Sequence, residues 1–197
     1  MRIEFLLEER SAEEVLRVVV PKIIGPEHEV DFSAFRGKPD LLANLESRLR
    51  AYRHWLPTDG RIVVLIDRDR ANCLVLKHQV DAIAARVGMA TRVLSRIAVE
   101  ELGAWYFGDV DAVVAAYKKV ERHLRNKAPY RDPDTVPGGA AEALERVLQR
   151  AGYHRGGLQK IRAARDIAPS MDPARNRSRS FQVFRGGILR LVGRGPD

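Results

Sequence analysis

The chain has 197 residues, 45% of them hydrophobic and 30% charged, a composition that excludes a disordered or fibrous protein. This length indicates one domain, or one with an appendage, and the net charge of +8 favours an acidic partner. No run approaches the roughly 18 apolar residues of a membrane span, and Glu4 comes too early for a secretory signal. The single cysteine, Cys73, and the lack of zinc-like Cys/His spacing favour a protein of the reducing cytoplasm.

The first half of the chain alternates between strand-like and helix-like segments. Short apolar runs and alternations predict strands over residues 3–7, 29–35, 62–66 and 91–99. Helical spacing predicts helices over residues 11–24, 39–55 and 72–87, and residues 100–107 are expected to form a helical turn or the start of a helix. Ser11 and Glu14 form a capping-box pattern, and Pro21 is expected to kink or end the first helix early. This order predicts an α/β fold with an open, mainly parallel sheet covered by helices on both faces.

The pattern changes after Gly108. Helical segments are expected at 109–124, 140–151, 156–167 and 180–192, with a Pro/Gly-rich loop at 128–139 and an irregular stretch at 169–178. We therefore expect residues 1–108 to form the α/β core and residues 109–197 to form a helical extension packed on it.

The positive charge is concentrated at the end of the chain. Residues 1–150 hold 24 basic and 23 acidic residues, whereas residues 151–197 hold 10 and 3, a net charge of +7. The extension is therefore basic from about residue 151. This asymmetry favours a surface that binds nucleic acid, with DNA the preferred candidate, over a basic tail that only aids solubility.

Acidic residues follow three of the four predicted strands. Glu8 follows the first strand, Asp67 and Asp69 follow the third, and Glu100 and Glu101 follow the fourth. If the first and third strands are neighbours in a parallel sheet, Glu8, Asp67 and Asp69 meet at one edge. Carboxylates this close repel one another unless a cation lies between them. We therefore expect a Mg²⁺ or Mn²⁺ site, with Glu100 or Glu101 as a further ligand.

Such a metal site beside a basic surface predicts hydrolysis of a phosphodiester. Glu9 could be a second ligand or a solvated neighbour. Six basic residues are candidate contacts to the nucleic-acid backbone: Lys38, Arg155, Lys160, Arg175, Arg177 and Arg179. The last three alternate and would project to one side of an extended segment, although a solvated Arg/Ser loop is the alternative. Arg155 and Lys160 flank a predicted helix start, which could bind phosphate or be only a turn.

Two stretches, LLEERSAE (6–13) and VLIDRD (64–69), resemble Toprim domains, which occur in topoisomerases, primases and OLD-type nucleases. Toprim domains carry a glutamate after their first strand and Asp-x-Asp after their third, so Glu8, Asp67 and Asp69 match. The match departs at Glu9, where many Toprim domains have glycine. The resemblance implies a Toprim-like fold and metal-dependent nuclease chemistry at these three residues.

Most of the chain is also similar to a bacterial group, domain of unknown function family 4276. The segments that carry this similarity are 37–42, 67–69, 97–102, 104–109, 130–134 and 172–181. The family has no settled activity. Its resemblance to OLD-like Toprim proteins implies a metal-dependent endonuclease or nickase working beside an ATPase in defence against phage. Gly103 stands where relatives often have glutamate, which weakens the third acidic site.

Two other function classes stay open. A phospho-accepting receiver domain also has acids after its first strand and an aspartate after its third. However, the expected Thr/Ser and Lys after later strands are missing, and Asp69 has no role there. The other alternative is a non-catalytic subunit that binds nucleic acid or an ATPase. The absence of a GxxxxGK[ST] motif argues against a P-loop enzyme.

Overall fold

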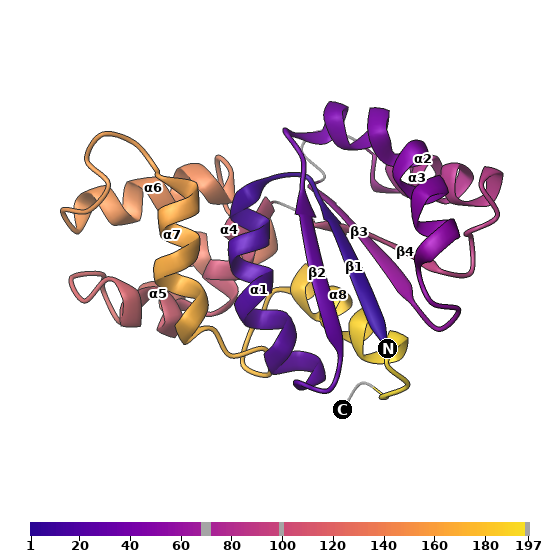
Figure 1. The fold of residues 1–197 in the computed structure, drawn as a ribbon. Coiled ribbons are helices and arrows are strands. Elements are labelled where there is room, and N and C mark those ends of the chain that lie inside the picture. The colour runs from indigo at the N-terminus through magenta and orange to yellow at the C-terminus, as the bar shows by residue number, and fades with distance from the viewer. Residues whose placement is uncertain (68–71, 99–100, 196–197) are drawn as a thin grey trace.

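The computed structural model describes residues 1–67, 72–98 and 101–195, apart from the Glu101 side chain, and the structural statements below concern this part of the chain. Its strands form one parallel sheet in the order β2-β1-β3-β4 (Figure 1). The strands are β1 (Arg2–Leu7), β2 (Glu29–Ala34), β3 (Arg61–Asp67) and β4 (Val93–Ala98). The predicted α/β fold with a mainly parallel sheet is confirmed. The first and third strands are neighbours, which is the condition under which Glu8 and Asp67 meet at one edge.

Helices cover both faces of this sheet (Figure 1). They are α1 (Arg10–Ile24), α2 (Lys38–Trp55), α3 (Cys73–Arg86), α4 (Glu101–Gly108), α5 (Val110–Ala116), α6 (Ala140–Arg150), α7 (Lys160–Ile167) and α8 (Arg179–Leu191). Short 3₁₀ turns are η1 (Leu124–Asn126), η2 (Ala128–Tyr130), η3 (Pro133–Thr135) and η4 (Ala168–Ser170). No helix in the described residues is long and apolar enough to cross a membrane.

The two central strands are buried on both faces, as their unbroken apolar runs indicate. Phe5 and Leu65 point into the larger core, which also holds α1 and residues of α4 to α8. Leu6 and Val64 point into the smaller core beneath α2 and α3. Side chains that alternate between two apolar cores fix the register of these strands, since a slip of one residue would exchange the two faces.

Helices α1 and α7 lie side by side and run in the same direction (Figure 1). Near their starts Lys160 pairs with Glu9, and one and a half turns later Arg165 pairs with Glu14 at 2.6 Å. Near their ends the Lys22 ammonium donates to the Pro169 carbonyl at 2.8 Å. Both helix N-termini therefore lie at the edge of the molecule where the parallel strands end.

The predicted capping box is wrong. Helix α1 begins one residue earlier than Ser11, with Glu9 as its N-cap, and Glu9 makes no side-chain capping bond. The Ser11 hydroxyl donates to the Glu9 carboxylate instead, and the Glu14 side chain accepts from Arg165. A long-range ion pair has therefore replaced the expected local bond, a contact that the local sequence cannot reveal.

Two helix ends also differ from expectation. Helix α1 continues through Pro21 to Ile24, because Ile23 and Ile24 are both buried and their burial offsets the hydrogen bond that proline lacks. The helix expected over 109–124 stops at Ala116. Beyond it the chain turns so that Tyr117 and Val120 are buried while the two lysines between them are exposed.

Gly103 lies where α4 packs against the start of α6. A Cβ atom there would come within 2.6 Å of the Ala140 carbonyl carbon and 2.8 Å of the Ala141 nitrogen. These are backbone atoms that cannot rotate away, so Gly103→Ala should destabilise the fold by about 1–3 kcal/mol. Urea unfolding measures this change. Gly156→Ala is the control, since its Cβ would meet nothing within 4 Å; equal stability of the two variants would contradict the close approach.

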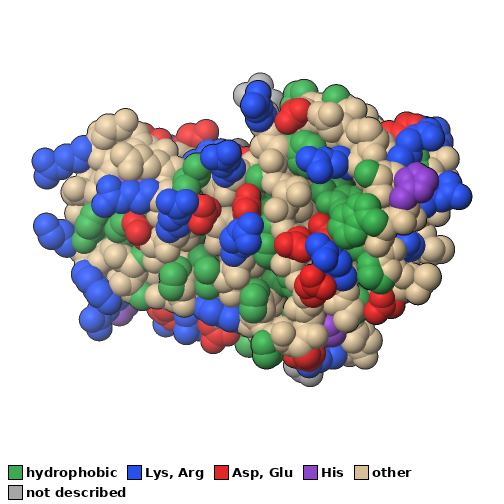
Figure 2. All heavy atoms as spheres, in the orientation of Figure 1, with side chains coloured by type: hydrophobic (Ala, Val, Ile, Leu, Met, Phe, Trp, Pro, Cys, Tyr) green, Lys and Arg blue, Asp and Glu red, His purple; other side chains and the backbone are tan. Residues whose placement is uncertain are grey.

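Basic side chains are prominent on the face shown in Figure 2. They occur over the right part of the view, where Figure 1 places α2 and α3, and also over the left part, where Figure 1 places α5, α6 and α7. This part of the surface adjoins the N-terminal ends of α1 and α7.

Candidate functional site

The carboxyl ends of β1 and β3 bring two predicted acids together. Leu7 pairs with Leu65 in the sheet, so Glu8 emerges beside the end of β3, where Asp67 is the last strand residue. The Asp67 backbone N–H donates to Glu8 Oε2 at 3.0 Å. This bond crosses 59 residues of sequence and fixes the Glu8 carboxylate at the end of the neighbouring strand.

The structure describes little of the other predicted acids, Asp69, Glu100 and Glu101. Asp69 and Glu100 lie outside the described residues. Glu101 is the first residue of α4 and comes three positions after Ala98, the last residue of β4, but its side chain is also outside the description. Among the described residues, no group of three or more His, Cys, Asp or Glu is placed to hold a metal ion.

The donor set of Glu8 and Asp67 nonetheless fits a hard divalent cation. Mg²⁺ commonly binds through one or two carboxylates, keeps several waters and leaves positions for substrate phosphate oxygens. Two carboxylates at adjoining strand ends are such a set. The fit depends on oxygen ligands alone and requires no histidine or cysteine.

Lys38 lies at the same edge, as expected for a parallel sheet. The backbone N–H of Gly37 donates to the Glu8 carbonyl at 2.9 Å, which ties the start of α2 to the end of β1. Gly37 has a φ of 98°, a conformation that favours glycine, and this turn leads directly into Lys38 as the first residue of α2. Lys38 therefore lies at the start of α2, and this helix start is hydrogen-bonded to Glu8, the first of the two predicted acids.

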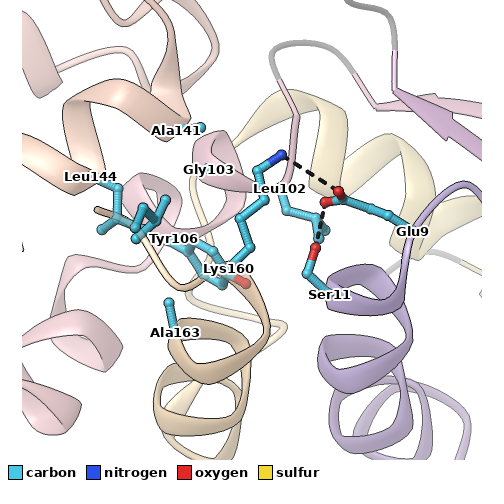
Figure 3. A pocket seen from close by; sticks show the side chains of 10 residues that line it. Glu9, Ser11, Leu102, Gly103, Tyr106, Ala141, Leu144, Lys160 and Ala163 are labelled. Carbon is cyan, nitrogen blue, oxygen red and sulfur yellow. Dashed lines mark hydrogen bonds and ion pairs between the residues drawn. The ribbon is translucent and has the colours of Figure 1, made fainter. Parts of the chain in front are cut away.

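Glu9 is not on a positive-φ turn but has extended backbone, with φ −143° and ψ 161°. Its carboxylate accepts from the Ser11 hydroxyl and pairs with the Lys160 ammonium at 3.5 Å (Figure 3). Lys160, predicted as a nucleic-acid contact, therefore lies beside the residue that follows Glu8. Helix α7 begins at Lys160, later than expected, and Arg155 lies exposed in the preceding turn.

A small pocket opens next to this ion pair, and we call it the Tyr106 pocket. Its space of about 20 Å³ is enough for about one water molecule. It is lined by Glu9, Ser11, Leu102, Gly103, Tyr106, Ala141, Leu144, Leu158, Lys160 and Ala163. The pocket thus joins the acidic edge to the C-terminal helices.

The Tyr106 hydroxyl is the unexpected polar group in this pocket. Its side chain is buried, and the hydroxyl has no hydrogen-bond partner among the described residues. Burial raises its pKa, and the negative charges of Glu9 and Asp67 raise it further, so the hydroxyl keeps its proton. The only hint in the sequence is a hydroxyl-bearing aromatic in the otherwise apolar stretch Leu102–Phe107.

The three alternating arginines are not held in an extended row. Arg175 lies in a turn, and its guanidinium bonds the buried Asp109 carboxylate at 2.9 and 3.0 Å. The Arg179 backbone N–H donates to Asp134 at the start of α8, whereas Arg177 is exposed. Carboxylates at distant positions in the chain therefore bend this segment and separate the arginines.

The same segment supports α4. Asn176 donates through Nδ2 to the Trp105 carbonyl at 2.8 Å, and the Trp105 indole donates to the Ser180 hydroxyl at 3.0 Å. Phe181 and Phe184 pack on the Trp105 ring at centroid distances of 5.1 Å each. The segment over 172–181 thus positions the helix that carries Tyr106.

A second polar cluster fixes the loop that leads into α7. The Tyr117 hydroxyl donates to Asp166 at 2.8 Å and lies 2.8 Å from His154 Nε2. The Gln159 backbone N–H donates to His154 Nδ1 at 3.2 Å. Because Nδ1 accepts, the neutral ring carries its proton on Nε2 and donates it to the Tyr117 oxygen. The neutral imidazole therefore anchors the residue before Lys160.

This geometry predicts a pH-dependent loss of stability. Burial, reinforced by Arg162 and opposed by Asp166, lowers the pKa of His154 below its usual 6.5. The contribution of His154 is then complete above pH 6.5 and falls as the pH drops from 6.5 toward the lowered pKa. The unfolding temperature, measured between pH 8 and 5, should therefore fall more in the original chain than in His154→Asn, which lacks the titrating imidazole.

Asparagine suits this control because His154 has a φ of 48°, which asparagine tolerates. His123, which is exposed, supplies the matched variant His123→Asn, whose pH profile should follow that of the original chain. Identical pH profiles for His154→Asn and the original chain would contradict the anchoring role.

Comparison with known proteins assigns the chain to a family. The family model for the domain of unknown function DUF4276 matches residues 7–189. The chain belongs to this family. The match runs from the last residue of β1 into α8, so it includes both the sheet and the C-terminal helices of this DUF4276 chain. No curated protein and no solved structure matched the sequence.

Proposed function

We propose that this DUF4276 chain is a metal-dependent nuclease, an endonuclease or nickase, with DNA as its favoured substrate. The observation that carries the proposal is the hydrogen bond from the Asp67 backbone N–H to Glu8, which holds the Glu8 carboxylate beside Asp67, the last residue of β3. Such a pair suits Mg²⁺ or Mn²⁺. The resemblance to Toprim domains adds Asp69, and either Glu100 or Glu101, as further ligands.

The roles of the residues follow from their positions. Glu8 and Asp67 would hold the cation, which when bound polarises a phosphoryl group and activates water. Lys38, on the turn anchored to Glu8, is placed to contact a phosphate of the substrate on one side of the acids. Lys160, which pairs with Glu9, is placed to contact another phosphate of the substrate on the opposite side of the acids.

A basic surface beside the acids supports a polyanionic substrate. The groove between the starts of α1 and α7 is lined by Arg10, Lys160, Arg162 and Arg165 against the acids Glu9 and Asp166. We call it the α1–α7 groove. It adjoins the basic surface of Figure 2. Phosphate contacts of this kind make binding fall steeply with salt.

A partner-dependent activity is the second candidate. Leu74 and Val75, in the first turn of α3, are 66% and 62% exposed. Adjacent exposed apolar side chains so near the end of β3 favour contact with another protein. The family resemblance suggests an ATPase working in phage defence. A chain that binds nucleic acid without cutting it, unless the ATPase is added, would favour this version.

Cleavage assays test the proposal directly. Supercoiled plasmid, linear duplex, single-stranded DNA and RNA are incubated with the purified chain in EDTA, Mg²⁺ or Mn²⁺. We expect cutting only with metal, and none by Asp67→Ala/Asp69→Ala. Metal-dependent cutting that survives in this double variant would overturn the proposal. Salt-sensitive binding without cutting, by both proteins, would indicate a non-catalytic subunit.

A further inference from the structure

Two helices begin side by side at the α1–α7 groove without side-chain caps. Neither Glu9 nor Gln159, the N-cap residues of α1 and α7, makes a capping hydrogen bond. The first amides of a helix lack partners within the helix, and its N-terminus carries partial positive charge. The α1–α7 groove therefore has two helix N-termini at its edge, and its lining contains four basic and two acidic residues. This excess of positive charge favours binding of an anion.

The Tyr106 pocket supplies an independent indication of a ligand. It shares Glu9, Ser11, Leu158 and Lys160 with the α1–α7 groove, so the two spaces adjoin. Tyr106 is only 4% exposed, and its hydroxyl has no partner among the described residues. Figure 3 shows this hydroxyl on the side of the ring that faces Lys160 and Ser11.

An unpaired buried hydroxyl is costly, by about 1–3 kcal/mol, so a group able to accept its proton is expected there. The pocket has room for about one oxygen atom and not for a sugar or a base. Any larger ligand must therefore lie in the α1–α7 groove and place a single oxygen in the pocket.

We propose that this site binds a phosphate monoester, with one oxygen accepting from the Tyr106 hydroxyl and the others meeting Lys160 and the two helix N-termini. A monoester has three non-bridging oxygens for these three sets of donors, whereas a diester within a chain has only two. The inference rests on the proposed function, because it identifies the favoured substrate as a nucleic acid with a phosphorylated end beside the metal site.

Glu9 has a positioning role in this site. Its carboxylate pairs with the Lys160 ammonium and accepts from the Ser11 hydroxyl, which keeps the ammonium at the mouth of the pocket (Figure 3). An ammonium group has three hydrogens that can donate to different oxygens, so one lysine can contact a carboxylate and a phosphate at the same time.

Binding in EDTA tests the site without any metal-dependent cutting. Fluorescence anisotropy is measured with one labelled oligonucleotide in three forms: 5′-phosphorylated, 3′-phosphorylated and unphosphorylated. Inorganic phosphate is the competitor. We expect one phosphorylated form to bind about tenfold more tightly than the unphosphorylated one, and phosphate to remove this advantage. The preferred end identifies where the phosphate enters.

Two variants assign the effect to the site. Tyr106→Phe and Lys160→Met should each lower the advantage of the phosphorylated end to less than threefold. Tyr106→Phe should keep the affinity for the unphosphorylated form within about twofold. Lys160→Met should weaken binding of the unphosphorylated form as well, because it also removes a contact to the nucleic-acid backbone, but it should weaken binding of the phosphorylated form more. Tyr106→Phe should also unfold at the same temperature as the original chain or higher, because the hydroxyl it removes has no partner among the described residues.

Tyr153→Phe and the exposed Lys118→Met are the matched controls and should keep the advantage. Equal binding of all three forms, or an advantage that survives Tyr106→Phe and Lys160→Met, would overturn the inference. Failure here leaves metal-dependent cutting to be judged by the cleavage assay, since the two experiments measure different steps.

Discussion

Glu8→Gln should lower metal-dependent cleavage by more than about a hundredfold. Even residues that only orient metal ligands change affinity or activity by 10–100-fold, so losing a ligand charge should have a larger effect. The substitution keeps the size of the side chain, and the glutamine carbonyl can still accept from the Asp67 N–H, the bond that measures 3.0 Å in the original chain. Activity should therefore fall while the unfolding temperature changes little.

Glu13→Gln is the control for this experiment. Glu13 lies in the first turn of α1 and pairs with Arg17 one turn later, an interaction worth only about 0.2–0.5 kcal/mol. Cleavage rates are measured over a range of Mg²⁺ and Mn²⁺ concentrations for both variants. Raising the metal concentration should partly restore Glu8→Gln. A Glu8→Gln variant as active as Glu13→Gln would place the metal elsewhere.

The core of the fold could be predicted because its signals are local. Residues 62–66 form an unbroken apolar run, and such a run in an alternating α/β pattern indicates a central parallel strand. The adjacency of Glu8 and Asp67 then follows from the geometry of the sheet. The end of the helix at Ala116 could not be predicted in this way, because it depends on where Tyr117 and Val120 find buried positions.

The part of the site contributed by the C-terminal helices depends on contacts across long stretches of chain. Glu9 and Lys160 are 151 residues apart in sequence, and no local pattern pairs them. In the sequence Tyr106 looks like a core aromatic. That its hydroxyl has no hydrogen-bond partner in the described part of the chain is evident only once α4, α6 and α7 are packed together. Net charge indicated a basic surface, but it could not distinguish an arginine that holds the fold from one that contacts substrate.

Arg175→Met should lower the free energy of unfolding by about 3 kcal/mol. The Asp109 carboxylate is 1% exposed, and the guanidinium of Arg175 is its cationic partner at 2.9 Å. Removing one member of such a pair leaves an uncompensated buried charge, which costs about 3–5 kcal/mol. The lower end applies, because Arg175 is 44% exposed and the Asp172 N–H still donates to Asp109 at 2.8 Å.

Comparing the stability losses of Asp109→Asn and Arg175→Met tests the role of this ion pair more sharply than either loss alone. Asp109→Asn removes the buried charge itself and leaves a half-exposed arginine that water can solvate. It should therefore cost less than Arg175→Met, about 1–2 kcal/mol. The double variant Asp109→Asn/Arg175→Met should be more stable than Arg175→Met alone. Urea unfolding of the three variants measures these differences.

Arg177→Met provides the matched control, because Arg177 is exposed two residues away in the same segment. Its stability should change by less than about 0.5 kcal/mol. Under conditions where all variants are folded, Arg177→Met should weaken DNA binding more than Arg175→Met does, because the Arg175 guanidinium is engaged by Asp109. If Arg175→Met instead folds normally and loses DNA binding, then Arg175 contacts phosphate, as its alternation with Arg177 and Arg179 first indicated.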